Sequence, residues 1–254
     1  WYMAGLWGYF LAGGIQGVLF PWIIAFVLHE SSERVGIAQM FSMLPMLLIG
    51  MFGGAAADRA ELRSHLMRLQ TVGVLPPLIL AVLIYNGVVS YSIMLLYAVT
   101  LSTLAGYIMP ARDSMLSRVA VNSLGGNFQR AVALAMSGQF LGQVGGYALG
   151  SPAEYIGAWP LLILQSSLLA FGAFATSRLA PAPPQPRASQ KKSPLRDVKE
   201  GLAAVWRHER IRPVLLLMFF SGILFMGVFM VLFPLLIRDV YQGGSREISF
   251  IFMS

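Results

Sequence analysis

The residues best suited to chemistry in this chain are charged groups at the ends of apolar segments. Asp58 adjoins Arg59, Arg63 follows four residues later, and Arg112 adjoins Asp113. An acid beside a base at a helix end forms ion pairs that can be made and broken, and a carboxylate can carry a proton. These residues are therefore candidates for a gate or a coupling site. Alternatively, they form a charge cluster that only fixes the orientation of the chain.

Four uncharged polar side chains lie inside apolar segments. Tyr9 and Gln16 belong to one such segment, and Gln139 and Gln143 belong to another. A glutamine amide in hydrocarbon needs hydrogen-bond partners, so these side chains should face a bundle interior or a wet cavity. Two interpretations stay open, namely contact with a substrate and hydrogen bonds between helices.

Long apolar segments position these residues and indicate a membrane protein. Hydrophobic residues make up 57% of the chain, charged residues 11%, and the mean hydropathy is +0.69, which excludes a soluble globular protein. A helix needs about 20 mostly apolar residues to cross a bilayer. Such segments occupy residues 4–27, 37–57, 66–85, 89–109, 128–149, 160–176 and 213–237, and an eighth begins near residue 248.

The order of these segments predicts an all-α, polytopic membrane bundle that is truncated. The chain opens on Trp1 and stops at Ser254, soon after the eighth segment begins. We expect residues 1–179 to form a six-helix bundle, residues 180–212 to form a linker and residues 213–254 to begin a second bundle. None of the charges is expected deep in a segment: Asp58, Arg112 and Asp113 should all be within reach of water.

Basic residues predict the orientation of the chain. If the first segment runs outward, fifteen of the 18 Lys and Arg residues fall on one side, and only Arg34, Arg238 and Arg246 fall on the other. Basic residues are retained in the cytoplasm, so we expect a bacterial inner-membrane protein whose N-terminus and 180–212 loop are cytoplasmic. The net charge of +7 follows from these loops and does not predict a nucleic-acid partner.

The long hydrophilic loop has two parts. Residues 180–186 read APAPPQP and predict an extended spacer. From Ser193 to Arg210, apolar and basic residues recur at helical spacing, which predicts an amphipathic helix lying on membrane lipids. Binding of this helix to a protein partner is the open alternative.

A stripe of glycines marks the fifth apolar segment, at Gly138, Gly142, Gly146 and Gly150. The four-residue spacing places these small residues near one helix face, where a neighbouring helix can approach closely. The stripe therefore predicts helix packing, or a face that moves during function.

The loop after the second segment resembles that of the major facilitator superfamily. In that family the loop carries Gly, three variable residues, Asp-Arg, and then further glycine and basic positions. Gly54, Asp58, Arg59 and Arg63 match this pattern. Glu61 stands where a glycine is usual, so we expect this loop to turn differently.

Two other stretches are similar to the enterobactin-exporter and macrolide-efflux branch of that superfamily. Residues 110–116, with Asn127 and Ala131 downstream, resemble the segment that joins helices four and five. Residues 197–212 resemble the approach to helix seven. The resemblance covers nearly the whole chain.

The resemblance implies a secondary active transporter that exports an amphipathic, drug-like or siderophore-like molecule by alternating access with proton antiport. It implies a latch at Asp58, Arg59 and Arg112, whose partner lies beyond Ser254, and a monomer when full length. Helices one and five border the family's cavity, so the four polar residues in them become candidate substrate contacts. A lipid or lysophospholipid translocator and a non-transporting scaffold or sensor remain alternatives.

Motifs for enzymatic chemistry are missing from the sequence. The chain has no Gly-Lys-Ser/Thr phosphate loop and no Gly-x-Ser-x-Gly elbow. His29, His65 and His208 do not stand at metal-ligand spacing. We therefore expect no enzyme, cofactor or metal, and the expected partners are a small-molecule substrate, membrane lipids and a proton.

Overall fold

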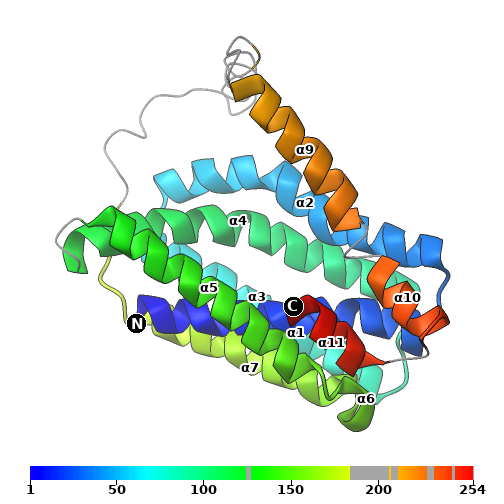
Figure 1. Cartoon of the computed structure of the whole chain (residues 1–254). Helices are drawn as coiled ribbons and strands as arrows, with labels where there is room; N and C mark the ends of the chain where they lie inside the picture. The colour runs from blue at the N-terminus through cyan, green and yellow to red at the C-terminus, as the bar shows by residue number, and fades with distance from the viewer. Residues whose placement is uncertain (124–126, 184–205, 207–210, 228–231, 242–243, 254) are drawn as a thin grey trace.

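Helices make up nearly all of the described chain. The computed structural model describes residues 1–123, 127–183, 206, 211–227, 232–241 and 244–253, and no strand occurs in these ranges. The expected all-α bundle is thus confirmed. Its elements in chain order are α1 (Tyr2–Trp22), the π-helix η1 (Ile23–Val27), α2 (Ser32–Arg59), α3 (Leu62–Tyr85), α4 (Tyr91–Ser123), α5 (Phe128–Gly150), α6 (Ala153–Ile156), α7 (Ala158–Ser177), α9 (Ile211–Gly227), α10 (Phe233–Asp239) and α11 (Ser245–Met253) (Figure 1).

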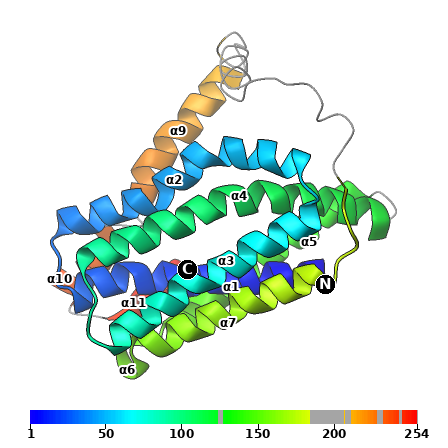
Figure 2. The same ribbon diagram turned by 180° about the vertical axis from the view of Figure 1, so that it is seen from behind.

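The bundle is arranged around α1, which is the most buried of its long helices. One side of α1 packs on α5 and another on α7, while α2 packs on α4, and α3 lies against α7 and α4 (Figures 1 and 2). Ile15, Leu19 and Ile24 form part of one buried apolar cluster, and Leu6 belongs to a second one nearer the start of α1. The outward faces stay apolar and exposed, as a lipid-facing surface requires.

The length and hydropathy of the described helices fit a membrane bundle. Four of them could each cross a membrane, namely Tyr2–Val27, Leu62–Tyr85, Tyr91–Val121 and Ala158–Ser177. The α2 helix makes a fifth if its two parts, which are bent by 48°, count as one span. The α5 helix is not among them, because its glutamines and glycines lower its hydropathy.

The fourth helix is longer than the sequence predicted. We expected the apolar segment to end at residue 109 and residues 110–116 to join two helices, but α4 continues through Pro110 to Ser123. Ala111 and Met115 are buried one helical turn apart, so the continuation has an apolar face that packs on the bundle. The joining segment was therefore a wrong prediction, and Arg112 lies inside a helix.

The last part of the chain is described in pieces. Helix α9 leans away from the other helices, whereas α10 and α11 lie against the bundle (Figure 1). Residues 213–237, predicted as one segment, are shared between α9 and α10, with residues 228–231 outside the described ranges. The predicted amphipathic helix at 193–210 also lies outside them, except for Trp206.

Candidate functional site

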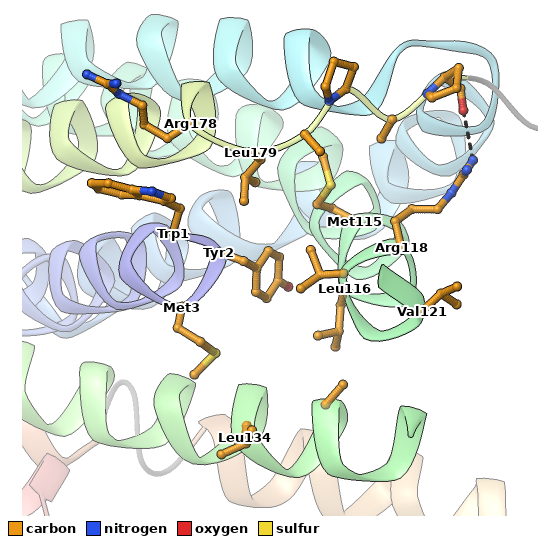
Figure 3. Close-up of a pocket in the computed structure, with 16 residues that line it drawn as sticks. Trp1, Tyr2, Met3, Met115, Leu116, Arg118, Val121, Leu134, Arg178 and Leu179 are labelled. Carbon is orange, nitrogen blue, oxygen red and sulfur yellow. Dashed lines mark hydrogen bonds between the residues drawn. The ribbon is translucent and has the colours of Figure 1, made fainter. Parts of the chain in front are cut away.

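Two adjoining cavities lie at the end of the bundle where α1 begins. The larger, of about 740 Å³, is enclosed by the start of α1, by α4 and α5, and by the segment that follows α7 (Figure 3). The smaller, of about 310 Å³, lies between α1, α4 and α5. Tyr2 and Leu116 line both cavities, and most of the other lining residues are apolar.

Arg112 places a buried cation in the smaller cavity. Its residue is 4% exposed, and its Nη1 and Nη2 have no hydrogen-bond partner among the described residues. The guanidinium carbon is 4.1 Å from the centre of the Tyr9 ring and 5.5 Å from that of Phe10. The Tyr2 hydroxyl donates to the Arg112 carbonyl oxygen at 3.2 Å. The expectation that Arg112 reaches water is therefore wrong, because aromatic rings of α1 cover it.

Of the other charges proposed for a latch, Asp113 is the one that lies beside Arg112. Asp113 is exposed and lines the same small cavity, while Asp58 and Arg59 are exposed at the end of α2. Within the described ranges, the ion pairs involve Arg34 with Glu30 and Arg238 with Asp239, and none of the proposed latch residues. Gly54 has open space around it. The structure therefore places Asp113 at the same cavity as Arg112, whereas Gly54, Asp58 and Arg59 line neither cavity.

Glu61 fastens the turn between α2 and α3. Its carboxylate caps α3, accepting from the amides of Arg63 at 3.2 Å and Ser64 at 2.7 Å, and it also accepts from the Ala182 amide at 2.8 Å. The Leu62 amide donates in turn to the Ala182 carbonyl at 3.0 Å. Although burial acts to raise the pKa of Glu61, these hydrogen bonds lower it to about 2. Sequence reasoning noted Glu61 only as a departure from a family pattern.

Two basic side chains hold the end of α7 and the segment beyond it. The Arg63 Nη2 donates to the Ser177 carbonyl at 2.6 Å, at the C-terminus of α7. The Arg118 Nη2 donates to the Pro183 carbonyl at 3.0 Å (Figure 3). Together with Glu61 they dock residues 178–183 as one wall of the larger cavity.

The polar residues within the spans divide between the two interpretations. Gln139 lines the smaller cavity, and Tyr9 stacks on Arg112 beside it. Gln16 instead accepts a hydrogen bond from the Gln165 amide at 3.3 Å, which joins α1 to α7. Gln143 is the exception, since it donates to the Tyr147 hydroxyl at 2.8 Å within α5, a hydrogen bond that fits neither interpretation.

Sequence reasoning overlooked two further buried amides. Gln165, 1% exposed, donates to the Tyr97 hydroxyl of α4 at 3.2 Å, and the Gln70 side chain accepts from the Thr176 hydroxyl at 2.8 Å. Both sit inside apolar segments, which is the signal that identified Gln16. They link α3, α4 and α7 through side-chain hydrogen bonds.

The four glycines of α5 all face α1. A Cβ atom at Gly138 would meet Met3, one at Gly142 would meet Phe10, and one at Gly150 would meet Val18. At Gly146 the contact is between backbones, because a Cβ there would lie 2.7 Å from the Gly14 Cα and closer still to the Leu11 carbonyl oxygen. The stripe lets α5 approach the central helix.

The opposite end of α1 is closed by residues of the second part of the chain. The Arg238 Nη1 donates to the carbonyls of Ala25 at 3.2 Å and Glu30 at 2.9 Å. Ser245 donates to the Ser151 carbonyl at 2.8 Å, and the α11 helix packs on α5 and α1. Sequence reasoning used Arg238 only for orientation and missed this contact.

The arrangement combines an apolar chamber with a buried positive charge. Such a site is better suited to binding a ligand than to making or breaking covalent bonds. No group of three or more His, Asp or Glu side chains in the described ranges could hold a metal ion.

In comparisons with known proteins, the family model described as Major Facilitator Superfamily matches residues 2–254. A search of curated proteins finds no match.

Proposed function

The chain belongs to the Major Facilitator Superfamily of membrane transporters, and on this premise we propose that the protein exports an amphipathic small molecule by alternating access. The sequence resemblance supports three finer parts of this proposal. They are the direction of transport, the proton antiport, and membership of the enterobactin-exporter and macrolide-efflux branch. We further propose a monomer in a bacterial inner membrane, with the N-terminus and the 180–212 loop in the cytoplasm. Residues 1–179 and 213–254 belong to its two halves.

The observation that carries this proposal is the asymmetry between the two ends of α1. At its start, two cavities of about 740 and 310 Å³ lie between α1, α4 and α5. At its far end, Arg238 binds the carbonyls of Ala25 and Glu30, and α11 covers α5. A protein that alternates between two access states has one end closed while a site is available from the other.

The same asymmetry supports different roles for the charged residues. Asp58 and Arg59, with Gly54 and Arg63, form the latch of the opposite state, when the end with the cavities closes. Arg112 would have to leave its stack on Tyr9 to join them. Asp113, exposed at the smaller cavity, and Asp58 are the candidate proton carriers.

A test uses the full-length protein in inverted membrane vesicles with a preset pH gradient. A pH-reporting dye is followed while amphipathic drugs, siderophores and lysolipids are added in turn. Dequenching that is lost in Asp58→Asn or Asp113→Asn is the expected result. No response to any compound, with the protein shown to be folded and inserted, would overturn proton-coupled export.

A lipid or lysophospholipid translocator is the second candidate, because Arg112 lines a cavity and could meet a charged headgroup. It is favoured if lysolipids cross without dequenching. A non-transporting scaffold or sensor is favoured if no compound crosses at all.

A further inference from the structure

Arg112 is a positive charge inside the bundle whose hydrogen-bonding edge is left unused by the protein. The residue is 4% exposed, and its Nη1 and Nη2 find no acceptor among the residues described. A guanidinium has five N–H donors and stays protonated in proteins. Because burying it without an acceptor costs free energy, a cation held this way in a membrane protein marks a functional position.

The aromatic residues of α1 determine which part of the guanidinium remains for a ligand. The guanidinium carbon lies over the Tyr9 ring, 4.1 Å from its centre. On the N–H edge, Nη1 and Nη2 are buried and make no hydrogen bond to the described residues. That edge presents paired donors whose spacing matches the two oxygens of a carboxylate or a phosphate.

The walls around this edge favour a ligand that is apolar elsewhere. Leu6, Met109, Phe128 and Met136 line the smaller cavity with Arg112, and this cavity shares Tyr2 and Leu116 with the larger one. The smaller cavity has mostly apolar walls and Arg112 as the one cation in its lining, which orients an amphipathic ligand by its charged end.

We propose that Arg112 binds the carboxylate or phosphate group of an anionic amphiphile whose apolar part lies between α1, α4 and α5. This assignment rests on the proposed transport function and names the class of substrate. Asp113 is the other charged residue in the lining of this cavity, and no ion pair joins it to Arg112 within the described ranges. Its carboxylate repels an anion, so its removal provides a test of opposite sign.

The experiment measures binding to the purified full-length protein in phosphatidylcholine nanodiscs. The probe is 11-bromoundecanoate, whose bromine quenches tryptophan fluorescence, and Trp1 lines the larger cavity. Its methyl ester and the matching trimethylammonium compound keep the brominated chain and carry a neutral and a cationic end group instead. We expect the carboxylate to bind best, and Arg112→Gln to weaken its binding about tenfold or more, since a charge-assisted hydrogen bond is lost.

Two further variants complete the design. Asp113→Asn should tighten binding of the carboxylate, and unchanged or weaker binding would contradict the repulsion assigned to Asp113. Arg68→Gln, at an exposed position of α3 that lines neither cavity, should have no effect. The proposal is overturned if the ester binds as tightly as the carboxylate, or if folded Arg112→Gln binds the carboxylate normally. The ester comparison needs no variant and stands even if Arg112→Gln does not fold.

Competition identifies the source of the anion. Dodecyl phosphate should displace the probe at micromolar concentration, whereas inorganic phosphate should not do so at a thousandfold excess. Equal displacement by both compounds would overturn the proposal that the ligand is an amphiphile. The anion site and the proposed transport function can fail independently. Binding that depends on Arg112, without any transport of a compound, would reject the transport function alone. Transport without such binding would reject the anion site alone.

Discussion

The guanidinium of Arg112 lies over the ring of Tyr9, with its carbon 4.1 Å from the ring centre. Arg112 comes from α4 and Tyr9 from α1, so this contact joins two helices that enclose the smaller cavity. The ring partly offsets the cost of burying the charge, because its face is electron-rich. The Nη1 and Nη2 of Arg112 make no hydrogen bond to the described residues, which leaves two donors for a ligand.

Removing the Tyr9 ring should destabilise the protein through Arg112. Tyr9→Ala is expected to lower the free energy of unfolding by about 2 kcal/mol or more, from lost burial and a lost cation–π contact. Tyr9→Phe keeps the ring and should stay close to the parent protein. Unfolding in a denaturant series measures both. Equal losses in the two variants would mean that the hydroxyl, rather than the ring, is what stabilises the site.

Glu61 should make stability sensitive to acid. Its pKa of about 2 in the folded protein lies below the ordinary value of 4.5, so its contribution is full above pH 4.5 and is lost as the pH falls towards 2. Glu61→Gln removes this titration. We expect the Tm difference between parent and variant to be largest near pH 7 and to shrink progressively below pH 4.5. A difference that is constant with pH would contradict the assignment.

Backbone contact at Gly146 of α5 predicts a steric effect that is absent at Gly13 of α1. Gly146→Ala places a methyl group against the backbone of Leu11 and Gly14, which should cost about 1–3 kcal/mol. Gly13→Ala is the matched control, because a Cβ atom there meets nothing within 4 Å. Thermal unfolding of both variants in the same detergent measures the effect. Similar Tm values for the two would show that α5 can shift to accommodate the methyl group.

The Arg238 contact predicts that the far end of α1 opens when that side chain is shortened. The chain has no cysteine, so a cysteine introduced at the buried Ala25 is the only thiol to label. In an otherwise unchanged protein this thiol should react slowly. Adding Arg238→Ala should raise its labelling rate severalfold, whereas adding Arg246→Ala, at an exposed position of α11, should not. An unchanged labelling rate with both substitutions would show that Arg238 does not keep this end of α1 closed.

The proposed orientation can be tested with the same chemistry. A cysteine at Ser189, in the 180–212 loop, should react with an impermeant maleimide in inverted vesicles and not in intact cells. Labelling in intact cells would reverse the predicted side of every loop.

The positions of the helices could be predicted because a membrane-spanning helix corresponds to a continuous run of apolar residues in the sequence. The α5 and α7 bounds lie within two residues of the predicted segments. The end of α4 could not be predicted in this way. Pro110 and the charges after it look like a loop in a hydropathy reading, although Ala111 and Met115 bury a helical face there.

The candidate site could be predicted only in its parts. Residue types and spacing identified Tyr9, Gln139 and Arg112, but placed Arg112 within reach of water. Its burial depends on Tyr9 and Phe10, which lie about a hundred residues earlier in the chain and reach it only through the packing of α1 on its neighbours. The Arg238 contact was missed for the same reason, since its acceptors are backbone carbonyls and carry no sequence signal.

The hydrogen bonds between Glu61 and Ala182 have a mechanical consequence. They anchor the chain after α7 to the first turn of α3, so the tether towards α9 effectively starts beyond this anchor and not at the end of α7 itself. A pull along that tether is borne first by the capped start of α3 and by the Arg118 bond to Pro183. A pull on the chain beyond residue 183 is thereby passed to the turn between α2 and α3, and the Arg63 bond to Ser177 shares it with the end of α7.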